Sequence, residues 1–261
     1  MVEWYLGTVG FSYKDWDGAF YPAGLPQRSY LAHYSQIFNA VELDSTFYGT
    51  PPVERVRQWA QIAPAGFKFC PKTPRQITHE LRLVKAEPAM LLFLASMRHL
   101  GDKLGPILIQ LPPSFSAGEF DTVAAFLTDL PGDLRYAVEF RHPSWYVFET
   151  AELLKAQGMA WVSLDYMDLP KQIGLTTDFL YIRWLGEHGR FEQKNRPQKD
   201  VSSELTWWWE YIQPHGGHVQ SIYGFFNNDY AGYSPGTCNQ FKTIVGLPIV
   251  NTELPQQGRL F

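Results

Sequence analysis

The sequence predicts an α/β fold of the TIM-barrel type, in which eight parallel strands alternate with helices and close into a ring. The chain has 261 residues, close to the roughly 250 that are usual for one such barrel. Short segments with strand character recur along it, and helical patterns lie between most of them. No glycine-rich phosphate loop follows any of these segments, which argues against an open doubly wound sheet.

The predicted strands combine β-branched and aromatic residues and are bounded by turn residues. Their regular recurrence is typical of a chain that alternates between strand and helix, because parallel strands need a crossover between them. In chain order they are Leu6–Gly10, Ala40–Asp44, Phe67–Lys72, Pro106–Leu111, Tyr136–Arg141, Ala160–Asp165, Phe179–Trp184 and Ile222–Asn227.

The stretches between the strands carry apolar residues at helical spacing. The weak element follows the sixth strand, because Pro170 and Gly174 interrupt residues 166–178, and we expect only an irregular helix there. Neither a linker nor an internal repeat is evident, so we expect one domain over residues 1–261. The stripes are Tyr30/Tyr34/Ile37, Val53/Val56/Trp59, Met90/Leu94/Met97/Leu100, Phe120/Val123/Leu127/Leu130 and Leu205/Trp208/Trp209/Ile212.

Composition and charge exclude several classes of protein. Hydrophobic residues make up 45% of the chain, which excludes intrinsic disorder, and the net charge of −4 argues against non-specific coating of nucleic acid. Cys70 and Cys238 form no disulfide or metal framework, which favours a reducing compartment. The N-terminus does not resemble a signal peptide, and no apolar run approaches the roughly 18 residues of a membrane helix. We therefore expect a cytoplasmic protein without a membrane partner.

Polar residues alternate with apolar residues in most of the predicted strands. In the second strand Val41 and Leu43 share one face, which leaves Glu42 on the other. Because the outer face of a barrel must be apolar to receive helices, we expect the polar set to point inward, near the C-terminal strand ends where barrel enzymes place their chemistry. The set is Glu42, Asp44, Lys68, Cys70, Lys72, Gln110, Glu139, Arg141, Ser163, Asp165, Tyr181, Arg183 and Asn227.

Four residues in or near this set are candidates for proton transfer. Glu42, Glu139 and Asp165 could serve as general acid and base, and His79 lies in a loop where it could shuttle a proton near neutral pH. The alternative is a buried network in which the carboxylates only pair with cations. Few histidines follow strands, so zinc is disfavoured and no cofactor is predicted. Ligation of Mg²⁺ or Mn²⁺ by the three carboxylates stays open.

Cations and aromatic residues at the same end predict an anionic ligand that contains a ring. Arginine suits phosphate or carboxylate oxygens, and aromatic faces stack on bases or sugars. The alternatives are permanent pairing of the arginines with the carboxylates, and packing of the aromatic residues against the rim. The candidate ligand-binding residues are Lys72, Arg141, Arg183, Gln110, Asn227, Tyr13, Tyr48 and Trp145.

Short motifs are spread over the whole chain: Gly7–Tyr13 with Trp16 and Phe20–Pro22, Val41–Tyr48, Phe67–Phe69 with Lys72, Pro74–His79, Gln110–Phe115, Glu139–Trp145, Tyr181–Arg183 and Phe225–Asn228. Their content and order resemble the YecE-like family, a domain family of unknown function. The resemblance implies a (β/α)₈ barrel over essentially the whole chain and little about activity. The chain departs from the family pattern at Asp44, where the family usually has Asn, and at Phe11, where it usually has Trp.

Together these features predict an enzyme that acts on a phosphorylated sugar, a nucleotide or a nucleic-acid end at the C-terminal mouth. Hydrolysis of a phosphoester or glycosidic bond fits best. Two other classes stay open, a non-catalytic nucleic-acid-binding barrel and a small-molecule sensor or scaffold; the net charge of −4 counts mildly against the first. Residues 185–201 are expected to form a lid over the substrate or a solvated loop.

Overall fold

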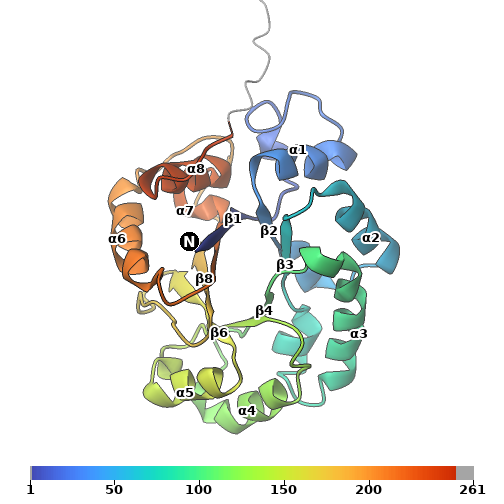
Figure 1. The fold of residues 1–261 in the computed structure, drawn as a ribbon, viewed down its shortest axis with the longest axis vertical. Coiled ribbons are helices and arrows are strands. Elements are labelled where there is room, and N and C mark those ends of the chain that lie inside the picture. Colours follow the sequence, from blue (N-terminus) through green and yellow to red (C-terminus); the bar gives the residue numbers. More distant parts are fainter. Residues whose placement is uncertain (1, 251–261) are drawn as a thin grey trace, which may run out of the picture.

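The strands form a ring at the centre of the molecule. A computed structural model describes residues 2–250, and Figure 1 shows the strands around a central axis with the helices outside them. Every predicted strand segment forms a strand, and the sixth is divided at Val162 into two short ones. The strands are β1 (Glu3–Val9), β2 (Ala40–Leu43), β3 (Lys68–Pro71), β4 (Ile107–Gln110), β5 (Tyr136–Glu139), β6 (Ala160–Trp161), β7 (Ser163–Asp165), β8 (Phe179–Trp184) and β9 (Ser221–Phe226).

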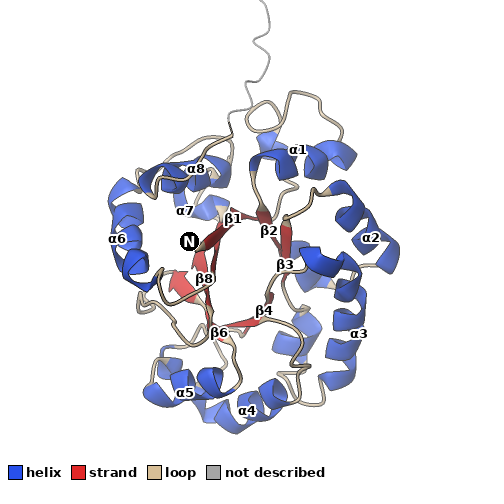
Figure 2. Cartoon of the chain, in the orientation of Figure 1, coloured by secondary structure: helices blue, strands red, loops and turns tan. Residues whose placement is uncertain are grey.

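The strand pairs are all parallel, as the alternation of strands and helices requires. One sheet has the order β3-β2-β1-β9-β8-β7 and the other the order β4-β5-β6. Where β3 lies next to β4, the two sheets are joined by isolated bridges, from Phe69 of β3 to Leu104 and from Lys72 to Leu108 of β4. The ring in Figure 2 therefore consists of two parallel sheets. Within residues 2–250 the strands do not form one continuous, closed sheet.

Helices surround the ring (Figure 2). They bury their apolar stripes against it. Each predicted stripe falls in a helix, with Leu100 and Leu130 just beyond the last turns. Within residues 2–250 no helix combines the length and apolar character that crossing a membrane requires. The helices are α1 (Tyr30–Ile37), α2 (Val53–Ile62), α3 (Glu87–Met97), α4 (Phe120–Thr128), α5 (Phe148–Ala156), α6 (Ser202–Ile212), α7 (Asn228–Ala231) and α8 (Ser234–Ile244).

The irregular helix expected after the sixth strand is absent, because residues 166–178 contain no helix. This segment instead bonds to the strand it follows. The amide of Gly174 donates to Ser163 Oγ at 2.9 Å, and the hydroxyl of Thr176 accepts from the amide of Trp161 at 2.9 Å. A Cβ at Gly174 would lie 2.2 Å from the Trp161 carbonyl oxygen, so glycine is required for this close approach.

The direction of the side chains is predicted correctly in β2, β5 and β8 and wrongly in the sixth predicted strand. Val162 and Leu164 belong to the apolar cluster inside the ring, together with Ala40. Ser163 and Asp165 therefore face outward, opposite to the expectation. The physical reason is that the segment between β7 and β8 contains no helix, so polar groups on this outer face find partners in residues 166–178 and in α6.

Candidate functional site

A buried ion-pair network joins three strands inside the ring. Arg183 of β8 pairs through Nη2 with Glu42 Oε1 of β2 at 2.6 Å, and through Nη1 with Glu139 Oε2 of β5. Tyr181 donates its hydroxyl proton to Glu42 Oε2 at 2.9 Å, and Arg141 Nε donates to Glu139 Oε1. Both carboxylates are fully buried. The parallel strands bring these residues together because each stands near the C-terminal end of its strand.

Charge balance explains the ionisation state of Glu139. Burial by itself raises the pKa of this carboxyl, but Arg141, Arg183 and Lys72 outweigh burial and lower the pKa to about 2. Burial lowers the pKa of Arg183, but Glu139 and Glu42 outweigh it, and the net shift is upward. The network and Lys72 therefore hold two carboxylates and three cations, and the cavity above them is also lined by the carboxylates of Asp44 and Asp229.

A cavity of about 260 Å³ opens above this network at the C-terminal ends of the strands. Five predicted ligand-binding residues line it, namely Lys72, Arg141, Arg183, Asn227 and Tyr48. The remaining lining residues are Val9, Asp44, Phe47, Tyr166, Leu185, Gly186, His188 and Asp229.

Lys72 immediately follows β3 and presents its amine to the cavity. Its Nζ lies 4.0 Å from the centre of the Phe47 ring, a cation–π geometry. Burial, followed by the nearby Arg183, lowers the pKa of Lys72 to about 8. On the same side, the Arg141 guanidinium lies 4.0 Å from the Tyr166 ring centre. The cationic wall of the cavity is thus backed by aromatic faces.

Asp44 is a cavity carboxylate outside the predicted catalytic set. It opens a 3₁₀ turn, Asp44–Tyr48, at the end of β2. Burial, reinforced by the negative charge of Glu42, raises the pKa of this carboxyl. The signal was present in the sequence, since Asp44 shares the inward face of the second strand with Glu42.

His79 lies behind the cavity wall rather than in it. Its ring packs edge-on against Phe47 with 5.0 Å between ring centres, and Nδ1 lies 2.8 Å from Thr78 Oγ1. Burial, together with the positive charges of Lys72 and Arg75, lowers the pKa of His79 to about 4. The imidazole is therefore neutral at neutral pH.

Asp165, predicted to join the other carboxylates, lies on the outer side of β7 and away from the cavity. Its Oδ2 accepts from the indole of Trp208 and from the hydroxyl of Tyr230, both at 2.7 Å, and Lys171 Nζ lies 2.9 Å from Oδ1. These partners hold α6 and α7 against the ring. The prediction that Asp165 belongs to the inward set is wrong, because β7 turns the opposite face to the interior.

Three predicted ligand-binding residues are not among those that line the cavity. Trp145 is fully buried, with its indole donating to the Phe115 carbonyl at 2.7 Å. Gln110 is buried and donates to the Leu111 carbonyl, and the Tyr13 hydroxyl donates to the Val9 carbonyl at 2.7 Å. The expectation that Trp145 faces a ligand is wrong, because its ring packs into the core on Phe140.

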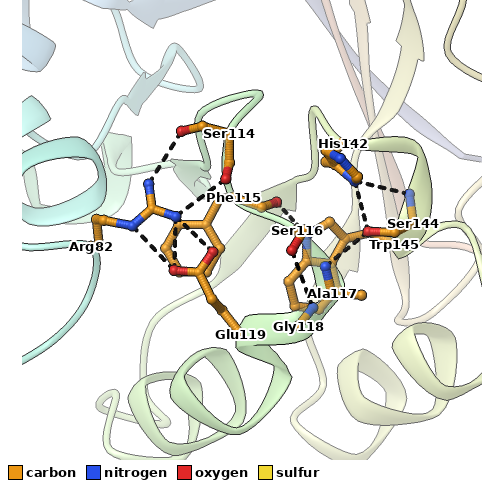
Figure 3. A network of polar contacts seen from close by, with 10 residues as sticks. All are labelled: Arg82, Ser114, Phe115, Ser116, Ala117, Gly118, Glu119, His142, Ser144 and Trp145. Atoms are coloured by element: carbon orange, nitrogen blue, oxygen red, sulfur yellow. Dashed lines mark hydrogen bonds and ion pairs between the residues drawn. The ribbon is translucent and has the colours of Figure 1, made fainter.

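A polar network, shown in Figure 3, connects the loop that carries Trp145 with the loops after β3 and β4. Arg82 pairs with Glu119, with 2.6 Å between Nη2 and Oε2, and so connects the loop after β3 to the loop after β4. Ser144, after β5, accepts from the amide of Ala117 at 2.8 Å, and its hydroxyl lies 2.7 Å from His142 Nδ1. These contacts fix three loops on one side of the mouth.

Residues 185–201, expected to be a lid or a solvated loop, run past the cavity without helix or strand. Gly186 approaches the helix that follows β9, where a Cβ would lie 2.2 Å from the Asp229 carbonyl oxygen. Lys194 Nζ lies 2.9 Å from Asp229 Oδ1, and the Lys194 amide donates to Asp15 at 2.9 Å. The segment is therefore anchored at the cavity by specific contacts.

The carboxylates considered as ligands for Mg²⁺ or Mn²⁺ are hydrogen-bonded to other side chains. Arg183, Arg141 and Tyr181 occupy the oxygens of Glu42 and Glu139. Across residues 2–250, no group of three or more His, Cys, Asp or Glu side chains is arranged to hold one metal ion. These residues form an ion-pair network rather than a ligand set.

The chain matches the family described as "Protein of unknown function DUF72" over residues 5–259. It is similar to the UPF0759 protein YecE of Escherichia coli, with 35% identity over 133 residues, which are 47% of this chain and 49% of that protein. This match spans about half the length of that relative. It is also similar to the UPF0759 protein YunF of Bacillus subtilis, with 29% identity over 260 residues, 87% of this chain and 89% of that protein.

The chain is also similar to solved structures of DUF72 family proteins. A DUF72 family protein from Thermotoga maritima has 30% identity and a TM-score of 0.79, covering 94% of this chain and 99% of that one. Another from Enterococcus faecalis, with 23% identity and a TM-score of 0.75 over 95% of this chain and 99% of that one, shows the shared fold. The chain therefore belongs to the YecE-like DUF72 family, as its motifs predict.

Proposed function

We propose that this protein is an enzyme that binds a small anionic, ring-containing substrate, a phosphorylated sugar above all, and hydrolyses a phosphoester or glycosidic bond in it. The proposal includes a single domain in which the strands and helices form a (β/α)₈ barrel with the active site at its C-terminal mouth. The observation that carries it is the cavity at the strand ends, where the Lys72 amine and the terminal nitrogens of Arg141 have no acidic partner among the described residues.

The anion would bind to the cationic wall of the cavity. Lys72 makes no ion pair with any described residue, and only Nε of Arg141 is engaged by Glu139. The terminal nitrogens of Arg141 are free to donate to phosphate oxygens, and Lys72 supplies a second positive charge. A sugar ring would contact Tyr166 and the exposed Tyr48 at the rim.

The carboxylates divide into two roles. Glu42 and Glu139 are held by arginines, and Glu139 with a pKa of about 2 is a weak base. We assign both of them to the positioning of Arg183 and Arg141. Asp44 has a raised pKa and no ion pair with any described residue, so we assign it the general acid or base role foreseen for Glu42 and Glu139.

Cavity size supports a small ligand over a nucleic-acid strand. A volume of about 260 Å³ lies below the roughly 300–1,000 Å³ of sites for drug-sized molecules. One phosphorylated monosaccharide, or the terminal nucleotide of a longer chain, suits this space. The net charge of −4 also favours a local anion site over an extended basic surface.

Calorimetric titration with inorganic phosphate, ribose 5-phosphate and ribose tests the binding step. We expect the phosphorylated sugar to bind at least about 10-fold more tightly than ribose, because a charged hydrogen bond contributes about 1.5–3 kcal/mol. Arg141→Gln should weaken phosphate binding by a similar factor. Lys68→Gln is the matched control, since Lys68 stands at the opposite end of β3 and donates to the Asp102 carbonyl. Equal affinity for ribose and ribose 5-phosphate would contradict the proposal.

Release of phosphate or sugar from a panel of sugar phosphates and glycosides tests the hydrolytic step. Where turnover is found, Asp44→Asn should lower kcat by about 100-fold or more while phosphate affinity is retained. If no member of the panel is hydrolysed by a protein that binds phosphate, the hydrolase assignment is wrong and the cavity is a binding site only.

A further inference from the structure

Lys72 lines the cavity and has no acidic partner among the described residues, whereas three lysines of nearby loops are paired. Lys171 pairs with Asp165, Lys194 with Asp229 and Lys199 with Glu204. Among the described residues, no carboxylate lies within ion-pair distance of Lys72 Nζ, whose contact is the face of Phe47 at 4.0 Å. Arg183 and Arg141 occupy Glu42 and Glu139, the two carboxylates of the network, and Asp44 forms no ion pair with Lys72.

The surroundings also make the amine more nucleophilic than an ordinary lysine. Burial, with the positive charge of Arg183, lowers the pKa of Lys72 to about 8. Roughly a tenth of the amine is then unprotonated at neutral pH, against less than roughly a thousandth for a solvated lysine. An amine desolvated beside other cations, at the end of a barrel strand and facing a cavity, has the environment of imine-forming lysines.

We propose that Lys72 is a covalent nucleophile that forms an imine with the free aldehyde or ketone of the bound anionic ligand. The inference rests on the proposed function for the anion site, and it narrows the substrate class to phosphorylated sugars that open to a free carbonyl. Arg141 would hold the phosphate while the carbonyl carbon approaches Lys72 across the cavity.

The chemistry balances within the cavity. The unprotonated Lys72 nitrogen attacks the carbonyl carbon, a C–N bond forms, the C=O π electrons move to the oxygen, and a proton passes from the nitrogen to that oxygen. The resulting carbinolamine then loses that oxygen as water, and the nitrogen lone pair closes the C=N bond to give a protonated imine beside the Asp44 carboxylate. Asp44, whose burial favours the protonated carboxyl, supplies the proton to the departing hydroxyl. No oxidant or reductant is consumed.

Reductive trapping tests the inference. The protein is incubated with ribose 5-phosphate and cyanoborohydride, which delivers hydride to the imine carbon and fixes the sugar as a secondary amine. Peptide mass mapping should place the adduct on Lys72, and excess inorganic phosphate should suppress it. Ribitol 5-phosphate carries the same phosphate without a carbonyl, so it should bind and leave no adduct.

Trapping should increase with pH around a midpoint near 8, as the amine loses its proton. This dependence belongs to Lys72 in its full electrostatic setting. The titratable and charged groups that face it are Glu42, Asp44, His79, Glu139, Arg141 and Arg183.

Two variants separate this inference from the proposed function. Lys72→Arg keeps a positive charge at the anion site but removes the amine, so it should lose the adduct even at ribose 5-phosphate concentrations that saturate the variant. Lys68→Arg should keep the adduct on Lys72 at its original yield. Binding of ribose 5-phosphate without an adduct on Lys72, or adducts of equal yield on Lys68 and Lys72, would overturn the imine and leave the anion site standing. Absence of binding by any phosphorylated sugar would overturn both.

Discussion

Charged side chains point in opposite directions on two sides of the ring. In β5 and β8 the charged side chains of Glu139 and Arg183 point into the ring and pair with each other. In β7 the charged side chain of Asp165 points out and is held by Trp208 and Tyr230. Both arrangements satisfy buried charge, but only the first contributes to the cavity.

The difference teaches that alternation along a strand identifies which residues share a face, and the covering elements decide which face is inside. Helices pack on the outer side of β5, so apolar Val138 faces them and Glu139 faces inward. Between β7 and β8 the chain forms no helix, and the polar atoms of residues 166–178 bond to the outer face of β7. Polar side chains on that face therefore have hydrogen-bond partners, which offset the free-energy cost of burying them.

The largest effect should come from breaking the inner network at its centre. Arg183→Met leaves Glu42 and Glu139 buried without their shared cation, and we expect it to lower the free energy of unfolding by about 3–5 kcal/mol. Denaturant unfolding measures the change. Arg135→Met is the matched control, because its pair with Asp178 is 43% exposed on each side and should contribute at most about 1 kcal/mol. Equal losses in the two variants would show that the inner network has no special weight.

A smaller effect should appear in acid. The pKa of Glu139 lies at about 2 in the folded state against 4.5 for the free group, so its ionised form stabilises the fold above about pH 4.5. That contribution is lost as the pH falls from about 4.5 to about 2. Urea unfolding across this range should show a slope that Glu139→Gln reduces by up to roughly 1.4 kcal/mol per pH unit. An unchanged slope in the variant would assign the acid sensitivity to other groups.

The smallest effect tests the outer arrangement. Asp165→Ala removes the acceptor shared by Trp208 and Tyr230, and we expect a loss of about 2 kcal/mol in the free energy of unfolding. Phosphate affinity should stay unchanged, because Asp165 does not line the cavity. The comparison is made with Asp44→Asn, which should alter turnover far more than stability. A weakened phosphate affinity in Asp165→Ala would remove the distinction between the two sides of the ring.

Much of the candidate site could be predicted from the sequence. Strand positions follow from composition and turn residues, and alternation then places Glu42, Glu139 and Arg183 on one inner surface. Lys72 follows β3 directly and Arg141 follows β5 after one residue, so the position of both at the mouth could also be predicted from the sequence. These predictions succeed because each depends on local spacing along a strand.

The residues that were missed or misplaced depend on contacts between distant segments. His188 and Asp229 reach the cavity from a loop and from α7, and no strand pattern marks them. Trp145 stands in a loop after β5 like a ligand-facing residue, yet its indole finds an acceptor at Phe115 and its ring a place in the core. Aromatic residues that face a ligand and aromatic residues that pack in the core both occur after strands, and the burial of the side chain distinguishes them.

By itself the sequence determined the order of strands and helices, the family and the set of inward polar residues in β2, β5 and β8. Only the tertiary structure decided which carboxylates form ion pairs with arginines, that Asp165 faces outward, and that Lys72 has an amine without an ion-pair partner among the described residues at the cavity. The physical reason is that side-chain spacing is a local property of the backbone. Ion pairing and desolvation depend on which distant segments meet.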